Sequence, residues 1–196
     1  MAVEPAAHLL TSASSPLGEA QQQRLLVIAR QSLEGFLCLG RRPEFAEADP
    51  ALRQPGALFV SLHKRRRVRG CMGDLARRLP LYRLAGDVAL TAALEDPRFH
   101  PVTAEELPEV TVEISVLSPF EPVRDPAEIE PGLHGMYIHD GAKRGLLLPQ
   151  VARERRWDRD AFLDQVALKA GLPMRAWRDG AALYRFTAQV FGEARP

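Results

Sequence analysis

Apolar residues recur at helical spacing in two long segments of the chain, and each segment is predicted to form a helix. The first helix covers 18–39, and Gly40 is suited to close it in a left-handed conformation. The second helix begins at Pro80, since proline favours the first turn of a helix. It is expected to end near Asp96 and Pro97, because a residue before proline disfavours helical backbone angles.

The clearest strand signal lies over 110–117, where apolar and polar residues alternate as they do in a strand with one buried face. Two shorter strands are expected over 56–62 and 68–73, joined by a turn over 63–67. The remaining strands are predicted at a hairpin over 136–148, with its turn at Asp140 and Gly141, and over 183–191.

Capping residues indicate two further helices. Thr103 and Glu106 have the spacing of a capping box. Asp158 or Asp160 begins a later helix, which ends before Gly171. Strands and helices follow one another without regular strand–helix–strand spacing. This order predicts an α+β fold with a mainly antiparallel sheet and flanking helices.

The chain has 196 residues, of which 46% are hydrophobic and 26% charged, as is typical of a globular protein. We expect 1–17 to be a flexible leader and 18–196 to form a single domain. The net charge of +1 disfavours a dedicated nucleic-acid-binding protein. The sequence has neither a membrane-spanning apolar run nor the pattern of a signal peptide. Its two cysteines cannot form a disulfide framework, which favours a cytoplasmic location.

The segment 69–73, Arg-Gly-Cys-Met-Gly, is the densest candidate for chemistry. Glycines on both sides of Cys71 leave room for a ligand to approach the main chain. Positive charge near a thiol favours the thiolate, which is the form that attacks electrophiles. The alternative has equal weight: Cys71 is a small buried side chain and the glycines are bulge residues. Cys38 lies in an apolar helical segment and is expected to be buried.

A run of basic residues precedes this cysteine: Lys64, Arg65, Arg66, Arg67 and Arg69. A hairpin tip of this composition is usually a solvated surface. The alternative is contact with the phosphates of a nucleic acid. No aromatic residue is interleaved with these charges, so nucleic-acid binding is the weaker interpretation.

Several polar residues outside this segment are also candidates. Glu113 is ordinary on a wet strand face, but beside a cleft it would act as a general acid or base. Arg98 and Gln150 are expected to orient a substrate together with Glu113. His134 and His139 are spaced so that they would lie on opposite faces of a continuous strand. Neither a metal-ligand spacing nor a nucleotide-binding motif is present, so no cofactor and no metal are predicted.

Short motifs stand in one order along the chain: Phe59-Val60-Ser61-Leu62, Val68-Arg69-Gly70-Cys71-Met72-Gly73, Asp96-Pro97-Arg98-Phe99, Val112-Glu113-Ile114-Ser115-Val116-Leu117, Gly145-Leu146-Leu147-Leu148-Pro149-Gln150-Val151 and Lys169-Ala170-Gly171-Leu172-Pro173. This order resembles the AMMECR domain family, whose bacterial and archaeal members are called AmmeMemoRadiSam system protein A. The resemblance extends from Leu25 to Phe191.

The resemblance implies a fold of two unequal lobes around a cleft that the Arg-Gly-Cys segment lines. It also implies a Memo-type protein and a radical SAM protein as partners, and it assigns no reaction. The site residues that it implies are Arg69, Gly70, Cys71, Gly73, Glu113, His134, Pro149 and Gln150.

Three functions remain open. The first is a cysteine-dependent enzyme or enzyme subunit that acts on a small anionic substrate. Cys71 would be its nucleophile, and His134 or Glu113 would move protons. The substrate-binding residues would be Arg69, Gly70, Gly73, Arg98, Pro149 and Gln150. The second function is a non-catalytic adaptor for the same partners, and the third is a nucleic-acid-binding protein.

Overall fold

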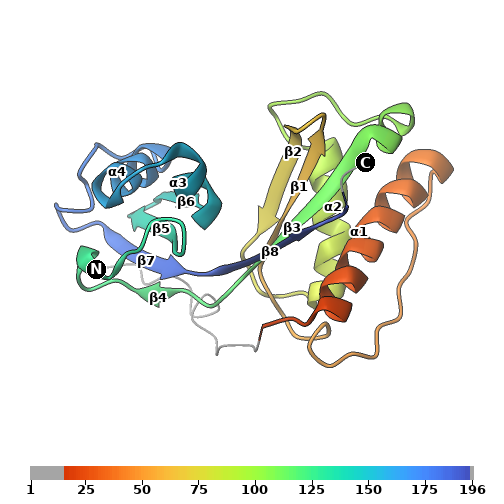
Figure 1. Cartoon of the computed structure of the whole chain (residues 1–196), viewed down its shortest axis with the longest axis horizontal. Coiled ribbons are helices and arrows are strands. Elements are labelled where there is room, and N and C mark those ends of the chain that lie inside the picture. Colours follow the sequence, from red (N-terminus) through yellow and green to blue (C-terminus); the bar gives the residue numbers. More distant parts are fainter. Residues whose placement is uncertain (1–15, 195–196) are drawn as a thin grey trace. The chain divides into compact units, whose positions relative to one another are not determined.

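Two four-stranded sheets organise the protein, and each has its own helices (Figure 1). The computed structural model describes residues 16–194, which divide into two compact units. The smaller unit comprises 118–188, and the larger one comprises 16–117 together with 189–194. The strand pairs at the centre of both sheets are antiparallel, which confirms the predicted α+β fold.

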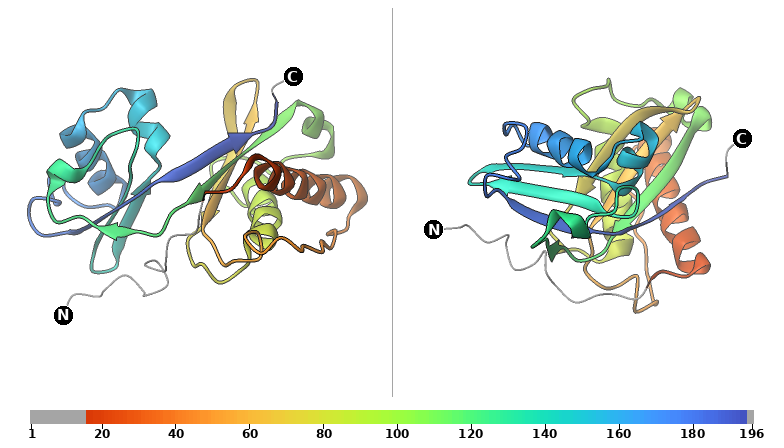
Figure 2. Two further views of the ribbon diagram at one scale, coloured as in Figure 1. Left: turned by 60° about the horizontal axis from the view of Figure 1, so that its bottom comes forward. Right: turned by 60° about the vertical axis from the view of Figure 1, so that its left-hand side comes forward.

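The larger unit contains long helices, short strands and one 3-10 helix. These elements are α1 (Glu19–Leu39), β1 (Leu58–Lys64), β2 (Arg67–Asp74), α2 (Leu81–Leu94), η2 (Ala104–Glu109), β3 (Val110–Leu117) and β8 (Ala188–Gly192). The strand order of the sheet is β2-β1-β3-β8, so β2 is an edge strand. Helices α1 and α2 cover one face of this sheet (Figures 1 and 2).

The sheet of the larger unit has an apolar face and a polar face. Val60 and Leu62 of β1 and Ile114 of β3 are buried in one core with α1 and α2. Because successive side chains of a strand point to opposite faces, the polar side chains lie on the other side. We call this side the polar face, and the strand register places on it Ser61, His63, Cys71, Thr111, Glu113 and Ser115.

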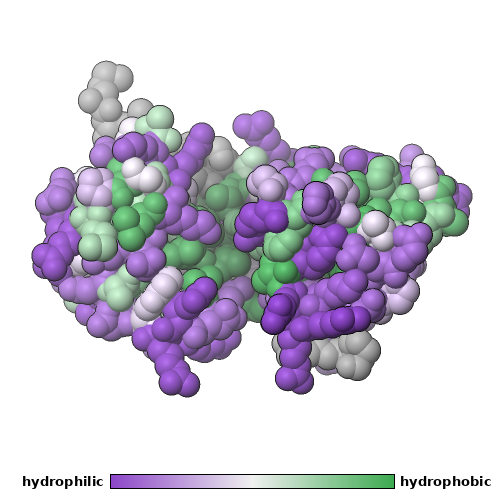
Figure 3. Space-filling model, turned by 90° about the horizontal axis from the view of Figure 1, so that it is seen from above, coloured by the Kyte–Doolittle hydropathy of each residue, from purple (hydrophilic) through white to green (hydrophobic). Residues whose placement is uncertain are grey.

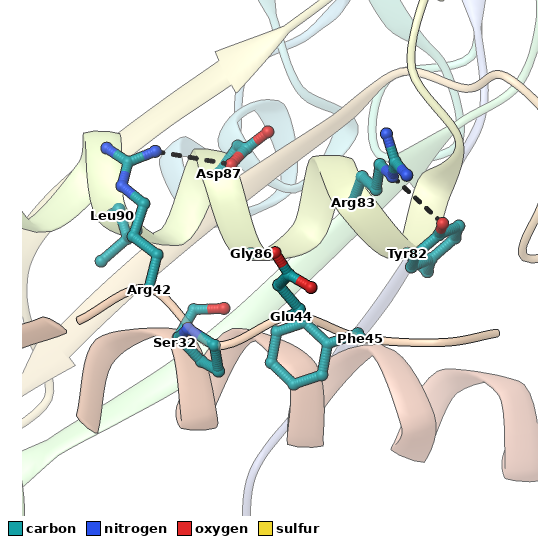
Figure 4. A pocket seen from close by; sticks show the side chains of 10 residues that line it. Ser32, Arg42, Glu44, Phe45, Tyr82, Arg83, Gly86, Asp87 and Leu90 are labelled. Carbon is teal, nitrogen blue, oxygen red and sulfur yellow. Dashed lines mark hydrogen bonds and ion pairs between the residues drawn. The ribbon is translucent and has the colours of Figure 1, made fainter. Parts of the chain in front are cut away.

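The two long helices begin and end where their sequence signals predict. Gly40 closes α1 with a φ of 64°, and Pro80 directly precedes α2. The helices pack closely because Gly86 of α2 has no side chain. A Cβ atom there would lie 2.6 Å from Oγ of Ser32 on α1 (Figure 4).

The smaller unit has a sheet of strand order β4-β7-β5-β6. Its elements are β4 (Glu121–Pro122), the 3-10 helix η3 (Pro126–Glu128), β5 (Gly135–Asp140), β6 (Lys143–Leu147), α3 (Pro149–Arg155), α4 (Arg159–Lys169) and β7 (Ala182–Phe186). Phe162 and Val166 of α4 share a core with Met136 and Ile138 of β5. Asp158 caps α4, because its side chain accepts a hydrogen bond from the backbone of Ala161 at 2.9 Å.

Several elements differ from the sequence prediction, which includes none of β4, η3 and α3. The strand expected over 183–191 is split into β7 and β8, which belong to different sheets. An alternating pattern shows only that residues are extended, so it cannot show that a chain changes sheets within the pattern. Helix α3 directly follows the hairpin predicted over 136–148, where no helix is expected from the sequence, and Pro149 stands at its first position.

The expectation that Cys38 is buried is wrong, since its thiol is exposed. It lies in the last turn of α1 next to Leu39, which is also exposed, where the helix extends beyond the core. Of the expected leader, residues 1–15 lie outside the described residues, and Leu17 is buried in the core of the larger unit. Among residues 16–194, no helix has both the length and the apolar composition needed to cross a bilayer.

Candidate functional site

Cys71 lies on the edge strand β2 with its side chain on the polar face. Its register partner on β1 is Ser61, whose hydroxyl donates a hydrogen bond to Sγ of Cys71 at 3.2 Å. Cys71 is partly exposed, whereas Ser61 is buried. A hydroxyl donor at this distance can stabilise negative charge on the sulfur.

The outer backbone groups of Cys71 are bound by a loop that follows α2. The N–H of Cys71 donates to Oδ2 of Asp96 at 2.8 Å, and Nη2 of Arg98 donates to the Cys71 carbonyl at 3.4 Å. These groups therefore point away from β1, and Cys71 and Ser61 form a non-hydrogen-bonded pair, in which side chains approach most closely. The loop also occupies the free edge of the sheet.

Asp96 and Arg98 form the ion pair that makes this arrangement stable. The Asp96 carboxylate accepts hydrogen bonds from Nε and Nη2 of Arg98 at 2.9 and 2.6 Å. The Arg98 guanidinium holds the pKa of Asp96 well below its usual range, and the N–H of Cys71 acts in the same direction. The Asp96 carboxylate in turn raises the pKa of Arg98. Both groups are therefore charged at neutral pH.

A row of polar residues crosses the sheet at Cys71. Ser61 on the central strand β1 pairs with Cys71 on one side and with Glu113 of β3 on the other. Nε2 of His63, two residues further along β1, lies 3.8 Å from Oε1 of Glu113. Sequence reasoning missed Ser61 and His63 as site residues. Strand periodicity could have found them, because both alternate with the buried Val60 and Leu62.

Arg69 is engaged within the larger unit. It occupies an irregularity of β2, where the register shifts between the pair of Leu62 and the pair of His63. Its guanidinium donates to both carboxylate oxygens of Glu106, at 3.2 and 2.8 Å. It also donates to the carbonyl of His100 at 2.8 Å. These contacts assign Arg69 a structural role that sequence spacing could not reveal.

The other basic residues of the hairpin tip divide into paired and exposed ones. Lys64 lies 3.1 Å from Glu106, and Arg65 lies 3.0 Å from Glu109. Glu106 and Glu109 belong to η2, so this helix neutralises part of the basic run. Two further basic residues are exposed: Arg66 in the turn, and Arg67 at the start of β2.

Close packing explains why glycine stands at both position 70 and position 73, on either side of Cys71. A Cβ atom on Gly70 would lie 2.1 Å from the carbonyl oxygen of Ala92, so α2 packs directly on the backbone of β2. A Cβ atom on Gly73 would lie 2.4 Å from the ring of Phe59, which covers that glycine on the polar face. Neither position has free space for a ligand on the side where a Cβ atom would stand.

Three predicted site residues lie in the smaller unit. Nδ1 of His134 accepts a hydrogen bond from the backbone of Glu130 at 3.0 Å. Desolvation by burial lowers the pKa of His134, and the charge of Arg185 acts in the same direction. Pro149 and Gln150 form the first turn of α3. Within the larger unit, Arg98 contacts the backbone of Cys71, and Glu113 lies on the same face as Cys71 with Ser61 of β1 between them, whereas His134, Pro149 and Gln150 belong to the other unit.

The candidate residues do not form a metal site by themselves. Within the described part of the chain, no group of three or more histidine, cysteine and acidic side chains is arranged to hold a metal ion. The chemistry that the Cys71 site offers with its own residues is therefore that of a thiol with a hydroxyl donor, and a carboxylate, Glu113, lies one strand further along the same polar face.

Several depressions of the larger unit have the volume of small-molecule sites. One, of about 760 Å³, is lined by residues of α1, η2 and β3, among them Cys38 and Leu39. Two others are smaller. One, of about 480 Å³, adjoins the Cys71 loop and is lined by Arg69, Pro97, Arg98, Phe99 and His100. The other, of about 390 Å³, lies between α2, α1 and the segment that follows α1 (Figure 4). In the second, Arg42 lies 3.8 Å from Asp87 and Arg83 donates to the Tyr82 hydroxyl. Hydrophilic residues cover most of the face of the protein that Figure 3 shows, with hydrophobic residues between them.

Fold and site together define an α+β protein with a partly exposed free thiol on the edge strand of an antiparallel sheet. The chain belongs to the AMMECR1 family, whose model matches residues 26–191. This confirms the family suggested by the sequence motifs.

Relatives of the chain span nearly its whole length. It is 42% identical to a protein of Aeropyrum pernix, covering 92% of this chain and 82% of that one. It is also 42% identical to a protein of Thermofilum pendens, covering 90% of this chain and 92% of that one. The crystal structure of an uncharacterized protein, PH0010, from Pyrococcus horikoshii is similar with a TM-score of 0.87 and 34% identity, covering 92% of this chain and 95% of that chain.

The ion pair between Arg69 and Glu106 predicts a specific acid sensitivity. Hydrogen bonds from Arg69 lower the pKa of Glu106 from 4.5 to about 2. The carboxylate therefore stabilises the fold fully above pH 4.5, and this contribution is lost as the pH falls toward 2. We expect Glu106→Gln to lower the free energy of unfolding by about 1–2 kcal/mol at pH 7.

Urea unfolding of the wild type and of Glu106→Gln at pH 7, 4 and 2.5 checks this expectation. The difference between the two proteins should shrink toward zero across the series. A difference that is the same at pH 7 and at pH 2.5 would contradict the assigned ion pair.

Proposed function

We propose that the protein is a cysteine-dependent enzyme or enzyme subunit that acts on a small anionic substrate at Cys71. The observation that carries this proposal is the hydrogen bond of 3.2 Å from the Ser61 hydroxyl to Sγ of a partly exposed Cys71. A cysteine that served only as a packing residue would need neither exposure nor a hydroxyl donor on its sulfur.

The reaction class is nucleophilic attack by sulfur. The Cys71 sulfur adds to an electrophilic carbonyl carbon of the substrate, the π bond of that carbonyl opens so that its electron pair moves to the oxygen, and the thiol proton leaves to a base. Glu113 and His63, which lie on the same polar face, are the titratable groups of the larger unit proposed to accept it, and Ser61 stands between Cys71 and Glu113. His134 belongs to the smaller unit, and its Nδ1 already accepts the backbone N–H of Glu130, so it has no part in this proposed step.

Arg98 is the residue best suited to bind the anionic part of a substrate. Its side chain is 58% exposed, and it contacts the Cys71 carbonyl. Arg69, the other predicted anion-binding residue, is 16% exposed and already donates to Glu106. The anion-binding role is therefore proposed for Arg98, and Arg69 supports the strand.

We further propose that the protein works with a Memo-type protein and a radical SAM protein, in the cytoplasm. This proposal depends on the resemblance to the AMMECR domain family and on the free thiols, which suit a reducing compartment. A non-catalytic adaptor remains the alternative. Nucleic-acid binding is disfavoured because η2 neutralises Lys64, Arg65 and Arg69.

Alkylation of the native protein tests the role of Cys71. With iodoacetamide at pH 7, Cys71 should react about tenfold faster than Cys38, although Cys38 is more exposed, because the Ser61 hydroxyl donates a hydrogen bond to Sγ of Cys71 in the proposed site. Ser61→Ala should remove this advantage. The matched control is Ser32→Ala, since Ser32 is buried on α1 and bonds to the carbonyl of Ile28. Mass spectrometry of the digest gives both rates in one sample.

Two results would overturn the catalytic proposal. One is a Cys71 that is inert or reacts no faster than Cys38. The other is an unchanged Cys71 rate in Ser61→Ala.

The proposed partners are tested with purified proteins. The full chain, mixed with a Memo-type protein and a radical SAM protein of the same organism, should co-elute with at least one of them in size-exclusion chromatography at micromolar concentration. Separate elution of all three proteins would contradict the proposed partnership and would leave the thiol chemistry untouched.

A further inference from the structure

A depression beside the Cys71 loop is the first element of this inference. Its volume of about 480 Å³ lies within the range of small-molecule sites. We call it the Phe99 depression, and its lining residues are Arg69, Pro97, Arg98, Phe99 and His100. Arg98, which lines it, also bonds to the Cys71 carbonyl, so the depression adjoins the backbone of the candidate nucleophile.

Of the two charged groups in the ion pair beside the Phe99 depression, only Arg98 is exposed to solvent. The side chain of Arg98 is 58% exposed, whereas that of its partner Asp96 is only 2% exposed. Hydrogen bonds to Asp96 and to the Cys71 carbonyl use Nε and Nη2 of Arg98. Its Nη1 makes no hydrogen bond within residues 16–194. The depression therefore offers a free donor to an anion while the matching carboxylate is hidden from solvent.

An apolar surface lies directly beside this donor. Phe99 is 36% exposed, and its ring centroid lies 5.4 Å from Cζ of Arg98 and 5.9 Å from Cζ of Arg69. Arg69 is fixed by Glu106, and Arg98 is fixed by Asp96. The ring is thus held next to two anchored guanidinium groups, so it can contact a ligand at little cost in side-chain entropy.

We propose that the Phe99 depression binds a small ligand that carries an anionic group on a flat ring. The anion lies at Nη1 of Arg98, and the ring packs against the exposed part of Phe99. The inference rests on the proposed function in one respect: it gives the substrate class for the site at Cys71.

Calorimetric titration of the full chain tests the proposal with two probes of this chemistry. Phenyl phosphate carries a phosphate on a flat ring, and 2-naphthoate carries a carboxylate on one, so the two arms distinguish the sources of the anion. At least one of them should bind. Phenol, which lacks the anion, and cyclohexanecarboxylate, which lacks the flat ring, should each bind at least tenfold more weakly.

Variants then place the probe in the depression. Phe99→Ala should weaken binding about tenfold, which corresponds to about 1.4 kcal/mol of lost contact. Phe99→Tyr should retain binding, because it keeps the ring. Arg98→Lys should weaken binding as well, since lysine lacks the forked donors that hold Asp96 and the anion together. The matched controls are Leu39→Ala and Arg42→Lys, exposed residues of the larger unit outside the depression.

The outcomes separate this inference from the proposed function. Absence of binding by both anionic probes at millimolar concentration overturns the inference. It is also overturned if the compound that lacks the anion, or the compound that lacks the flat ring, binds as tightly as the probes. An unchanged affinity in Phe99→Ala also overturns it. If the inference fails while Cys71 is alkylated rapidly, the catalytic proposal stands alone. If a probe binds as described while Cys71 is inert, the depression stands and the catalytic role fails.

Discussion

The ion pair between the buried Asp96 carboxylate and the exposed Arg98 guanidinium is the constraint on which the candidate site depends. It binds the outer N–H and carbonyl of Cys71 in place of a neighbouring strand. Edge strands with free backbone groups are open to pairing with other chains, and this pair closes the edge at the position of the thiol. One interaction therefore protects the edge of the sheet, fixes the backbone of Cys71 and presents the Arg98 guanidinium to solvent.

The polar face follows from the same geometry. Since Cys71 and Ser61 form a non-hydrogen-bonded pair, their side chains approach closely and the hydroxyl reaches the sulfur. On the opposite face of the sheet, the backbone of α2 contacts β2 directly, because Gly70 has no side chain. The thiol thus stands on a strand that is held from behind by a helix and at its edge by an ion pair. Such support from rigid elements is what a reactive side chain needs.

Much of the fold could be predicted from the sequence, because α1, α2 and β3 combine strong periodicity with clear end signals. The chemistry of the residue types and the family resemblance were also enough to predict Cys71, Glu113 and Arg98 as candidate site residues. Ser61 and His63 were missed because they look ordinary until the strand register sets them beside Cys71 and Glu113. The structural role of Arg69 could not be predicted either, because its partner Glu106 is distant in sequence. Long-range pairing is a tertiary property that local patterns do not carry.

Amide hydrogen exchange at Cys71 is the most direct measurement of the central claim. In the wild type this amide should be protected, because it donates to a buried carboxylate. In Asp96→Ala its exchange should accelerate at least tenfold relative to the matched control Glu95→Ala, which changes the neighbouring exposed residue. Equal exchange rates at Cys71 in the two variants would contradict the claim that this ion pair holds the site.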